Sequence, residues 1–154
     1  MAAAAILAAA FLGWSALTPS GDITLSERRT QLVASAQDVL SLEWTATEDS
    51  AATGASGDVA WSSAEQAGYM RFRGLKANDP TVTQYQLWVF DAKRDERYPV
   101  DGGVFDIPTD ATEIVVPIAA KIFVSQPTLF AVTVEAPGGV VVSSRERIVL
   151  LAAL

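Results

Sequence analysis

Cysteine and histidine are both absent from the 154 residues of this sequence. Without cysteine, no disulfide can cross-link the fold, and cysteine usage says nothing about the redox compartment. Without histidine, the commonest general base and metal ligand are missing, so Cys/His zinc sites and Ser-His-Asp or Cys-His catalytic groups are excluded. An enzyme would have to work with carboxylates, lysine, tyrosine or serine alone. We therefore expect no catalytic residues, no metal site and no cofactor.

Basic residues are also scarce. The sequence has 11 Lys and Arg against 18 Asp and Glu, which gives a formal net charge of −7. Nucleic-acid binding requires a clustered basic face, so this balance predicts that nucleic acid is not a partner. The acidic excess is typical of a solvated surface that keeps a protein soluble.

An uncharged apolar run extends from Ala2 to Leu17 and carries Trp14 near its end. It is slightly shorter than the about 20 residues that span a bilayer, and it lacks the basic start of a signal peptide. We interpret residues 1–17 as the C-terminal part of a transmembrane helix that begins upstream of this sequence, with the Trp14 ring at the membrane interface. An atypical signal sequence and a buried helix of a soluble protein are the alternatives. Residues 1–27 contain no lysine or arginine, so charge does not orient the segment.

Residues 18–41 are predicted to form a linker followed by an amphipathic helix. A cluster of turn residues precedes Thr24, and Thr24 and Glu27 have the spacing of a capping box at a helix start. We expect a helix over roughly 25–40 that packs on its own domain or on a neighbouring copy in a homo-oligomer, with Arg28 and Arg29 solvated on the opposite face. The apolar stripe of this helix consists of Leu25, Leu32, Ala36, Val39 and Leu40.

Residues 42–154 are predicted to form a β-domain, because short segments rich in β-branched and aromatic residues alternate with turn residues. Within one of them, Met70 and Phe72 alternate with Arg71 and Arg73, as in a half-exposed antiparallel strand. No helical pattern intervenes, so we expect a mainly β fold, an antiparallel two-sheet β-sandwich of immunoglobulin-like architecture preceded by N-terminal helical segments. The expected strands cover 42–45, 58–62, 69–74, 84–91, 98–105, 113–117, 129–136 and 140–151, the last two as a hairpin.

Two of these strands carry recognisable motifs. Tyr85–Asp91 contains a Tyr-x-Leu-Trp motif, and Phe130–Gly139 contains a Val-Thr-Val-Glu strand that runs into a Pro-Gly-Gly turn. A Gly-x-Met strand at 68–75, a Gly-Gly-x-Phe segment at 102–105 and a closing strand at 147–151 complete the set. Five motifs in this order resemble the C-terminal extracytoplasmic domain of transmembrane anti-sigma factors of the anti-sigma-K family, over nearly the whole β-domain. The residues that carry the resemblance are Tyr85, Leu87, Trp88, Gly103, Phe105, Val132, Thr133, Val134, Glu135, Gly138 and Gly139.

The resemblance implies a regulatory role. Members of this family look like single-pass cell-membrane proteins in which a cytoplasmic helical domain holds an extracytoplasmic-function sigma factor, and regulated proteolysis releases that factor. The implied partners are a sigma factor, bound by a cytoplasmic domain that is absent from this chain, the membrane through residues 1–17, and a regulatory protease. The β-domain is implied to lie outside the cytoplasm. The alternative function is a stand-alone envelope module that binds glycan or peptide through an exposed aromatic residue.

Four groups of residues in the β-domain are candidate sites. Tyr85 and Trp88 must lie on opposite faces of one strand, so one is expected in the core and the other could be a stacking platform. Glu135 is expected to bind a turn amide or an arginine. Residues 145–147 are expected to form an exposed, salt-linked strand face. Acidic residues around the hairpin at 91–101 suggest calcium or a glycosidase pair only weakly, because basic residues are interleaved with them.

Overall fold

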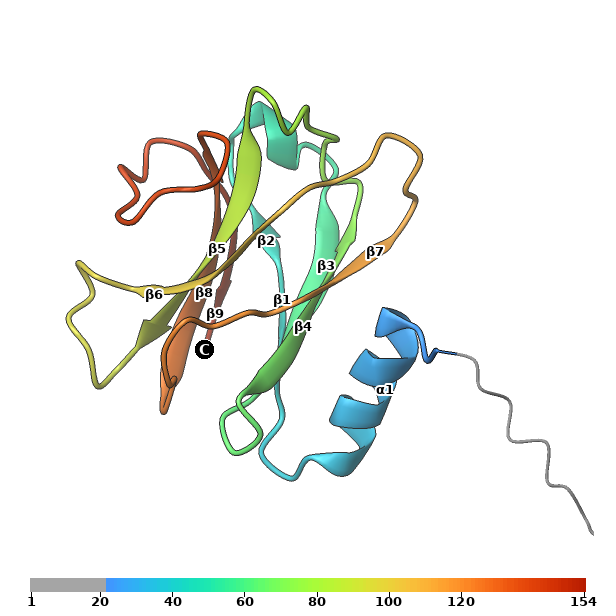
Figure 1. Cartoon of the computed structure of the whole chain (residues 1–154), viewed down its shortest axis with the longest axis vertical. Helices are drawn as coiled ribbons and strands as arrows, with labels where there is room; N and C mark the ends of the chain where they lie inside the picture. The colour runs from blue at the N-terminus through green and yellow to red at the C-terminus, as the bar shows by residue number, and fades with distance from the viewer. Residues whose placement is uncertain (1–21) are drawn as a thin grey trace, which may run out of the picture.

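The computed structural model describes residues 22–154 and consists of two antiparallel β-sheets with a single helix packed beside them (Figure 1). The proposed membrane segment, residues 1–17, lies outside the described residues. Within residues 22–154, no helix combines the length and the apolar character that crossing a bilayer requires. The elements are α1 (Leu25–Ser35), β1 (Leu40–Glu43), β2 (Thr45–Ala46), the 3₁₀ helix η1 (Ser50–Ala52), β3 (Ser56–Ser62), β4 (Ala67–Arg73), β5 (Gln84–Asp91), β6 (Val100–Phe105), β7 (Ile114–Pro117), β8 (Pro127–Glu135) and β9 (Ile148–Ala153).

The two sheets confirm the predicted mainly β, antiparallel fold in a sandwich-like arrangement. One sheet has the strand order β1-β3-β4-β7, and the other has the order β2-β9-β8-β5-β6. The chain passes from the first sheet to the second at Trp44, between β1 and β2. The second and the last strands of the domain, β2 and β9, pair where Thr45 lies opposite Leu151.

The core lies between the sheets and is built by strands that alternate inward and outward residues. Met70 and Phe72 of β4 are each 1% exposed, and the arginines between and after them face outward, as predicted. Phe72 stacks on Trp44 at a ring-centroid distance of 5.6 Å and on Phe105 at 5.2 Å, and Phe105 stacks on Tyr85 at 5.6 Å. These rings form one continuous stack that joins the two sheets.

The helix begins as predicted and ends earlier than predicted. Thr24 caps α1, and the reciprocal contacts with Glu27 confirm the capping box. The helix stops at Ser35 instead of continuing to Leu40, because Leu40 already pairs with Trp61 as the first residue of β1. The predicted stripe is also wrong in extent, since Leu32 is its only buried member within α1.

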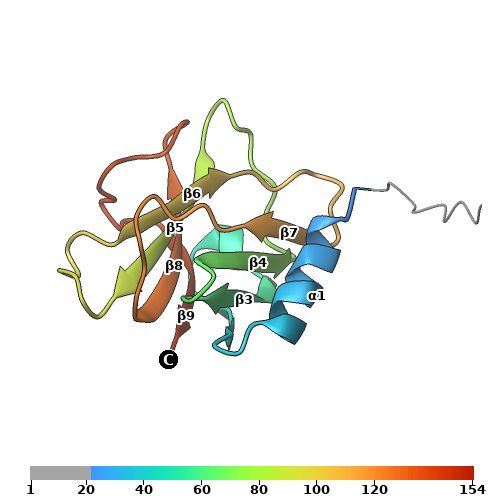
Figure 2. The same cartoon turned by 60° about the horizontal axis from the view of Figure 1, so that its bottom comes forward.

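Helix α1 covers the outer face of the four-stranded sheet, where Figure 2 shows it beside β3, β4 and β7 and away from β5 and β8. Asp58 of β3 faces the helix and forms ion pairs with both Arg29 of α1 and Arg71 of β4. Arg29 is therefore not solvated as predicted, and it ties the helix to the sheet. Because α1 covers one face and the core covers the other, five consecutive residues of β3 are buried.

The predicted hairpin at the end of the chain is confirmed, because β8 and β9 pair antiparallel, but its second strand begins later than predicted. Residues 136–147 form a loop between β8 and β9, and strand structure resumes only at Ile148. In Figure 1 this loop, drawn in red, lies on the side of the molecule away from α1.

Because Asp58 forms two ion pairs, its replacement by alanine is expected to lower stability more than the replacement of an acidic residue that forms one exposed pair. Asp58→Ala should lower the free energy of unfolding by about 2 kcal/mol, because it leaves two partly buried guanidinium groups without their shared carboxylate. This value is below that of a fully buried pair, since the Arg71 side chain is 30% exposed. Urea denaturation at neutral pH measures the change.

Glu113→Ala is the matched control. Glu113 pairs with Arg73, whose side chain is 54% exposed, so its loss should change stability by well under 1 kcal/mol after solvent screening. Equal losses in the two variants would show that Asp58 does not fasten the helix.

Candidate functional site

Strand β5 presents the Tyr-x-Leu-Trp motif to both faces of the five-stranded sheet. Tyr85 and Leu87 point into the core, and Trp88 points to the outer face. Tyr85 and Trp88 are nevertheless both 2% exposed. Their placement on opposite faces follows the predicted alternation, but the interpretation of one of them as an exposed stacking platform is wrong, because residues 136–147 cover the outer face at Trp88.

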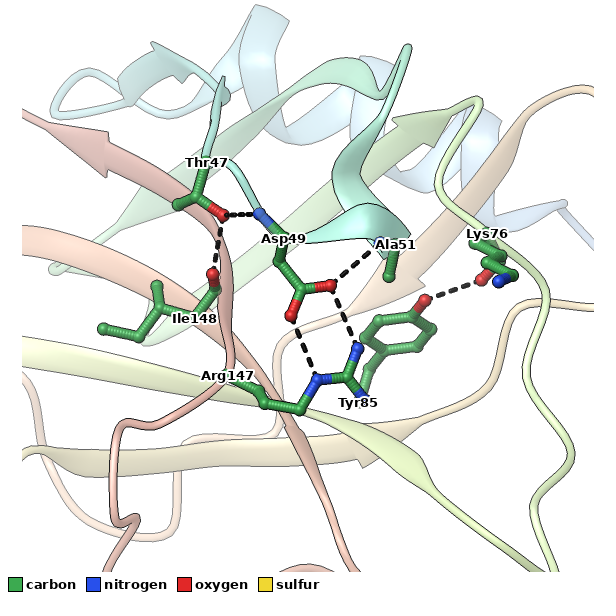
Figure 3. Close-up of polar contacts among 7 residues, drawn as sticks. All are labelled: Thr47, Asp49, Ala51, Lys76, Tyr85, Arg147 and Ile148. Atoms are coloured by element: carbon green, nitrogen blue, oxygen red, sulfur yellow. Dashed lines mark hydrogen bonds and ion pairs between the residues drawn. The ribbon is translucent and has the colours of Figure 1, made fainter.

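The phenol group of Tyr85 reaches the polar end of the sandwich shown in Figure 3. Its hydroxyl donates to the carbonyl oxygen of Lys76 at 2.6 Å. Burial raises the pKa of Tyr85 to about 12, so the hydroxyl stays protonated at neutral pH and remains a donor. A cavity of about 230 Å³ adjoins it and is lined by both apolar and polar groups, among them Lys76 and Arg147.

Arg147 forms a two-point ion pair with Asp49 in the same cluster (Figure 3). The Nε and Nη2 atoms of Arg147 each lie 3.0 Å from a carboxylate oxygen of Asp49, which also accepts the backbone N–H of Ala51 at 2.8 Å. The hydrogen bonds from Arg147 lower the pKa of Asp49, and those to Asp49 raise the pKa of Arg147. The pair joins the start of η1 to the chain just before β9. Residues 145–147 are exposed and Arg147 is salt-linked, as predicted, but they lie in the loop before β9 and not in a strand.

The Pro-Gly-Gly segment forms a tight turn at the end of β8. The N–H of Gly139 donates to the carbonyl of Ala136 at 2.9 Å, and Gly138 has φ of 87°. With Pro137 in the second position, this is the arrangement of a type II turn, which requires a positive φ at the third residue. Gly139 also has a positive φ, 73°, and a Cβ there would lie 2.5 Å from Val104 and 2.8 Å from the Gln86 amide oxygen.

Two glutamines of β5 hold this turn against the sheet. The side chain of Gln86, which is 1% exposed, donates to the carbonyl of Val140 at 3.0 Å and accepts the N–H of Val140 at 2.9 Å. Gln84 accepts the N–H of Gly138 at 2.8 Å. The two motif segments are therefore bonded to each other. Neither glutamine was predicted as a site residue, although a buried amide within an apolar strand must find partners.

A second chain of hydrogen bonds crosses the outer face from Trp88 to the loop. The indole N–H of Trp88 donates to Thr133 Oγ1 at 2.9 Å, and the Thr133 hydroxyl donates to Glu135 at 2.6 Å. The same oxygen of Glu135 accepts the hydroxyl of Ser143 in the loop at 2.5 Å. Glu135 thus binds two hydroxyl groups, and the predicted partners, a turn amide or an arginine, are wrong.

The remaining motif residues lie in the core or at strand irregularities. Val132 is fully buried, and Val134 packs against the core from its edge. Phe105 belongs to the aromatic stack. Gly103 has φ of 110° beside the irregularity where β5 and β6 change register. The structure therefore places the whole motif set in fold-forming positions.

A larger depression lies on the outer face of the same sheet. It has a volume of about 660 Å³ and is lined by apolar residues of β5, β8 and β9 and by charged residues of two loops. Arg145 reaches across it: its guanidinium lies 5.3 Å from the centroid of the Phe90 ring and donates to the carbonyl of Glu96 at 2.6 Å. Arg145 has φ of 60°, an uncommon backbone conformation for a side chain of this size.

The acidic residues around the 92–99 loop bind protein groups. Asp91 accepts the backbone N–H groups of Lys93 at 2.8 Å and Ser125 at 2.6 Å; burial opposes ionisation, but these bonds outweigh it and lower the pKa of Asp91. Asp95 pairs with Arg97. In the part of the chain that the structure describes, no three acidic side chains gather as metal ligands would.

The family model described as anti-sigma-K factor rskA, C-terminal, matches residues 1–144. The chain belongs to this family. No curated protein and no solved structure matches it.

The anti-sigma-K family is regulatory rather than enzymatic, and its name implies a sigma factor as partner. The match starts earlier than the resemblance recognised in the sequence and includes the apolar run and α1. It ends within the 136–147 loop, so β9 lies beyond it, although β9 pairs with both β2 and β8 and completes the anti-sigma-K sandwich.

The two glycines of the turn in this anti-sigma-K domain are expected to differ in how much stability is lost when each is replaced by alanine. Gly138→Ala should cost about 1 kcal/mol, the conformational penalty alone, because a Cβ there meets nothing within 4 Å. Gly139→Ala should cost about 3 kcal/mol, because its Cβ would also push Val104 and the Gln86 amide apart. Thermal unfolding of both variants measures the difference. Equal losses of stability would mean that the contact between the Gln86 side chain and the turn does not constrain the loop.

The Asp49–Arg147 pair predicts a pH-dependent contribution to stability. The folded-state pKa of Asp49 is lowered, so its contribution is present above the pKa of about 4 in the unfolded chain and is lost as pH falls through the folded value. Asp49→Asn should reduce stability at pH 7 by about 1 kcal/mol, a value discounted for the partial exposure of Arg147, and by much less at pH 3.

Urea unfolding at the two pH values checks this, with Asp95→Asn as control. Asp95 pairs with Arg97 on the surface, only two residues away, so its substitution should leave stability unchanged. A deficit of Asp49→Asn that persists at pH 3 would contradict the electrostatic origin.

Proposed function

We propose that this chain is the extracytoplasmic regulatory and sensor domain of a membrane-anchored anti-sigma factor that controls an extracytoplasmic-function sigma factor. The family match over residues 1–144 carries the proposal. In the part of the chain that the structure describes, the motif residues are engaged in the fold, which supports regulation through attachment and contact rather than through chemistry.

The position of α1 supports a mechanical connection to the anchor. The helix begins at Leu25, shortly after the apolar run ends at Leu17, and Asp58 binds Arg29 of the helix to the sheet. In this proposal residues 1–17 anchor the chain in the membrane, and α1 holds the sandwich close to the membrane surface. A regulatory protease would act on the anchored protein, and a domain outside this chain would hold the sigma factor.

The structure removes the basis of the alternative function. An envelope module for glycan or peptide was expected to use Tyr85 or Trp88 as an exposed platform, and both are buried. The net charge of −7 disfavours a direct role in nucleic-acid binding.

The absence of cysteine makes the proposed topology directly testable. Val141 is 94% exposed in the loop between β8 and β9, so Val141→Cys provides a single accessible thiol. In intact cells that produce the protein, a membrane-impermeant maleimide should label this thiol. Ala152→Cys, at a position 1% exposed, is the matched control and should be labelled only after denaturation.

The same cells can be used to test whether the protein binds a sigma factor. Crosslinking and purification of the complete gene product should recover a sigma factor, identified by mass spectrometry, and residues 1–154 alone should not. Labelling of Val141→Cys only after lysis would overturn the topology. Recovery of a sigma factor with residues 1–154 alone would overturn the assignment of sigma binding to another domain.

A further inference from the structure

The 660 Å³ depression on the outer face of the five-stranded sheet has the size of a small-molecule site. Its floor is apolar and comes from three adjacent strands: Phe90 of β5, Leu129 and Ala131 of β8, and Leu151 of β9. Loops 92–99 and 136–147 flank it, so the hollow is a groove in the surface rather than a closed cavity.

The floor provides almost no hydrogen-bonding partners. Strand β8 lies between β5 and β9 and pairs with both, so its main-chain groups are used within the sheet. The Thr128 hydroxyl at the rim already donates to the carbonyl of Phe90 at 3.3 Å. An extended peptide laid in the groove would bury amide groups without partners, which is costly. The floor therefore favours an occupant with an apolar body and few polar groups.

Four charged side chains line the groove: Asp91, Arg94, Glu96 and Arg145. Asp91 lines the groove, but its carboxylate is bound to the backbone of Lys93 and Ser125. Arg94 also lines the groove and forms no ion pair within residues 22–154. Arg145 donates one N–H to the carbonyl of Glu96, and its guanidinium has four further N–H donors. The Glu96 carboxylate forms no ion pair within residues 22–154, so two guanidinium groups and one free carboxylate remain available beside the apolar floor, an excess of one positive charge.

We propose that this groove binds a small amphiphilic anion: an apolar body that lies on Ala131, Leu129 and Leu151, with a carboxylate or phosphate group held by Arg94 and Arg145. Guanidinium pairs such oxyanions in a two-point geometry, and the apolar floor takes up the chain. A free fatty acid has this chemistry. The site belongs to the folded β-domain and does not depend on the proposed role in sigma-factor control.

Photoaffinity labelling of the complete 154-residue chain in lipid nanodiscs tests the site. The probe is octanoate that carries a diazirine in its chain. We expect crosslinks in the peptides that contain Phe90, Leu129 and Leu151, and competition by free octanoate. Octanol, which has the same chain without the charge, should compete about tenfold more weakly, because a charge-assisted hydrogen bond is lost.

Substitutions separate a specific site from general attraction. Arg94→Gln and Arg145→Gln should each weaken octanoate competition about tenfold. Lys93→Gln removes a neighbouring exposed cation that does not line the groove, and should change nothing. Ala131→Leu extends a side chain from the floor into the groove and should abolish labelling, with a melting curve to show that the variant is folded.

Several results would overturn the proposal. Crosslinks elsewhere in the chain would place the ligand outside the groove. Equal competition by octanol, or an equal loss in Lys93→Gln, would show that the two arginines do not recognise an anion. Stronger competition by a short peptide with a free C-terminal carboxylate would assign the groove to peptides. None of these results bears on the proposed role in sigma-factor control.

Discussion

The stack of aromatic rings between the two sheets is the contact on which the rest of this structure depends. No disulfide can hold the sheets together in a chain without cysteine. The rings of Trp44, Phe72, Phe105 and Tyr85 bridge the layers instead, with successive centroids 5.2–5.6 Å apart. Burial of such rings is the largest apolar contribution that single residues can make to a core of this size. Through Tyr85, the stack also fixes strand β5, which carries the candidate site on its other face.

Side chains on the outer face of β5 hold the 136–147 loop in place. Gln86 bonds the main chain of Val140 at two points, and Trp88 starts the hydrogen-bond chain that ends at Ser143. Buried polar groups of this kind stabilise a structure only when all are paired, so the loop is held in one arrangement. The resulting loop places Arg145 over Phe90, at the edge of the groove.

Much of the fold could be predicted because local patterns and tertiary contacts agree. The alternation around Met70 and Phe72, the capping box at Thr24 and the span of Gln84–Asp91 all match the structure. The errors occurred where a distant contact overrides a local pattern. The helical stripe continued to Leu40, but pairing with Trp61 made that residue part of a strand. Similarly, Arg29 looked solvated, because its partner Asp58 follows 29 residues later.

The candidate site was predictable only in part, for the same reason. Periodicity indicated that Tyr85 and Trp88 lie on opposite faces, but it did not show that a loop covers Trp88. The contact of Gln86 with Val140 joins residues 54 positions apart, and that of Asp49 with Arg147 joins residues 98 apart. No local pattern encodes such a pair.

Composition and strand periodicity act along the chain, so the class of fold, the family and the excluded kinds of chemistry follow from the order of the residues. Which polar groups meet, and which apolar surface stays open, depends on the folded arrangement. Side-chain hydrogen bonds act over about 3 Å, so they depend on how strands and loops from distant parts of the chain are brought together. The groove and its two arginines exist only because β5, β8 and β9 form one face and two loops close around it.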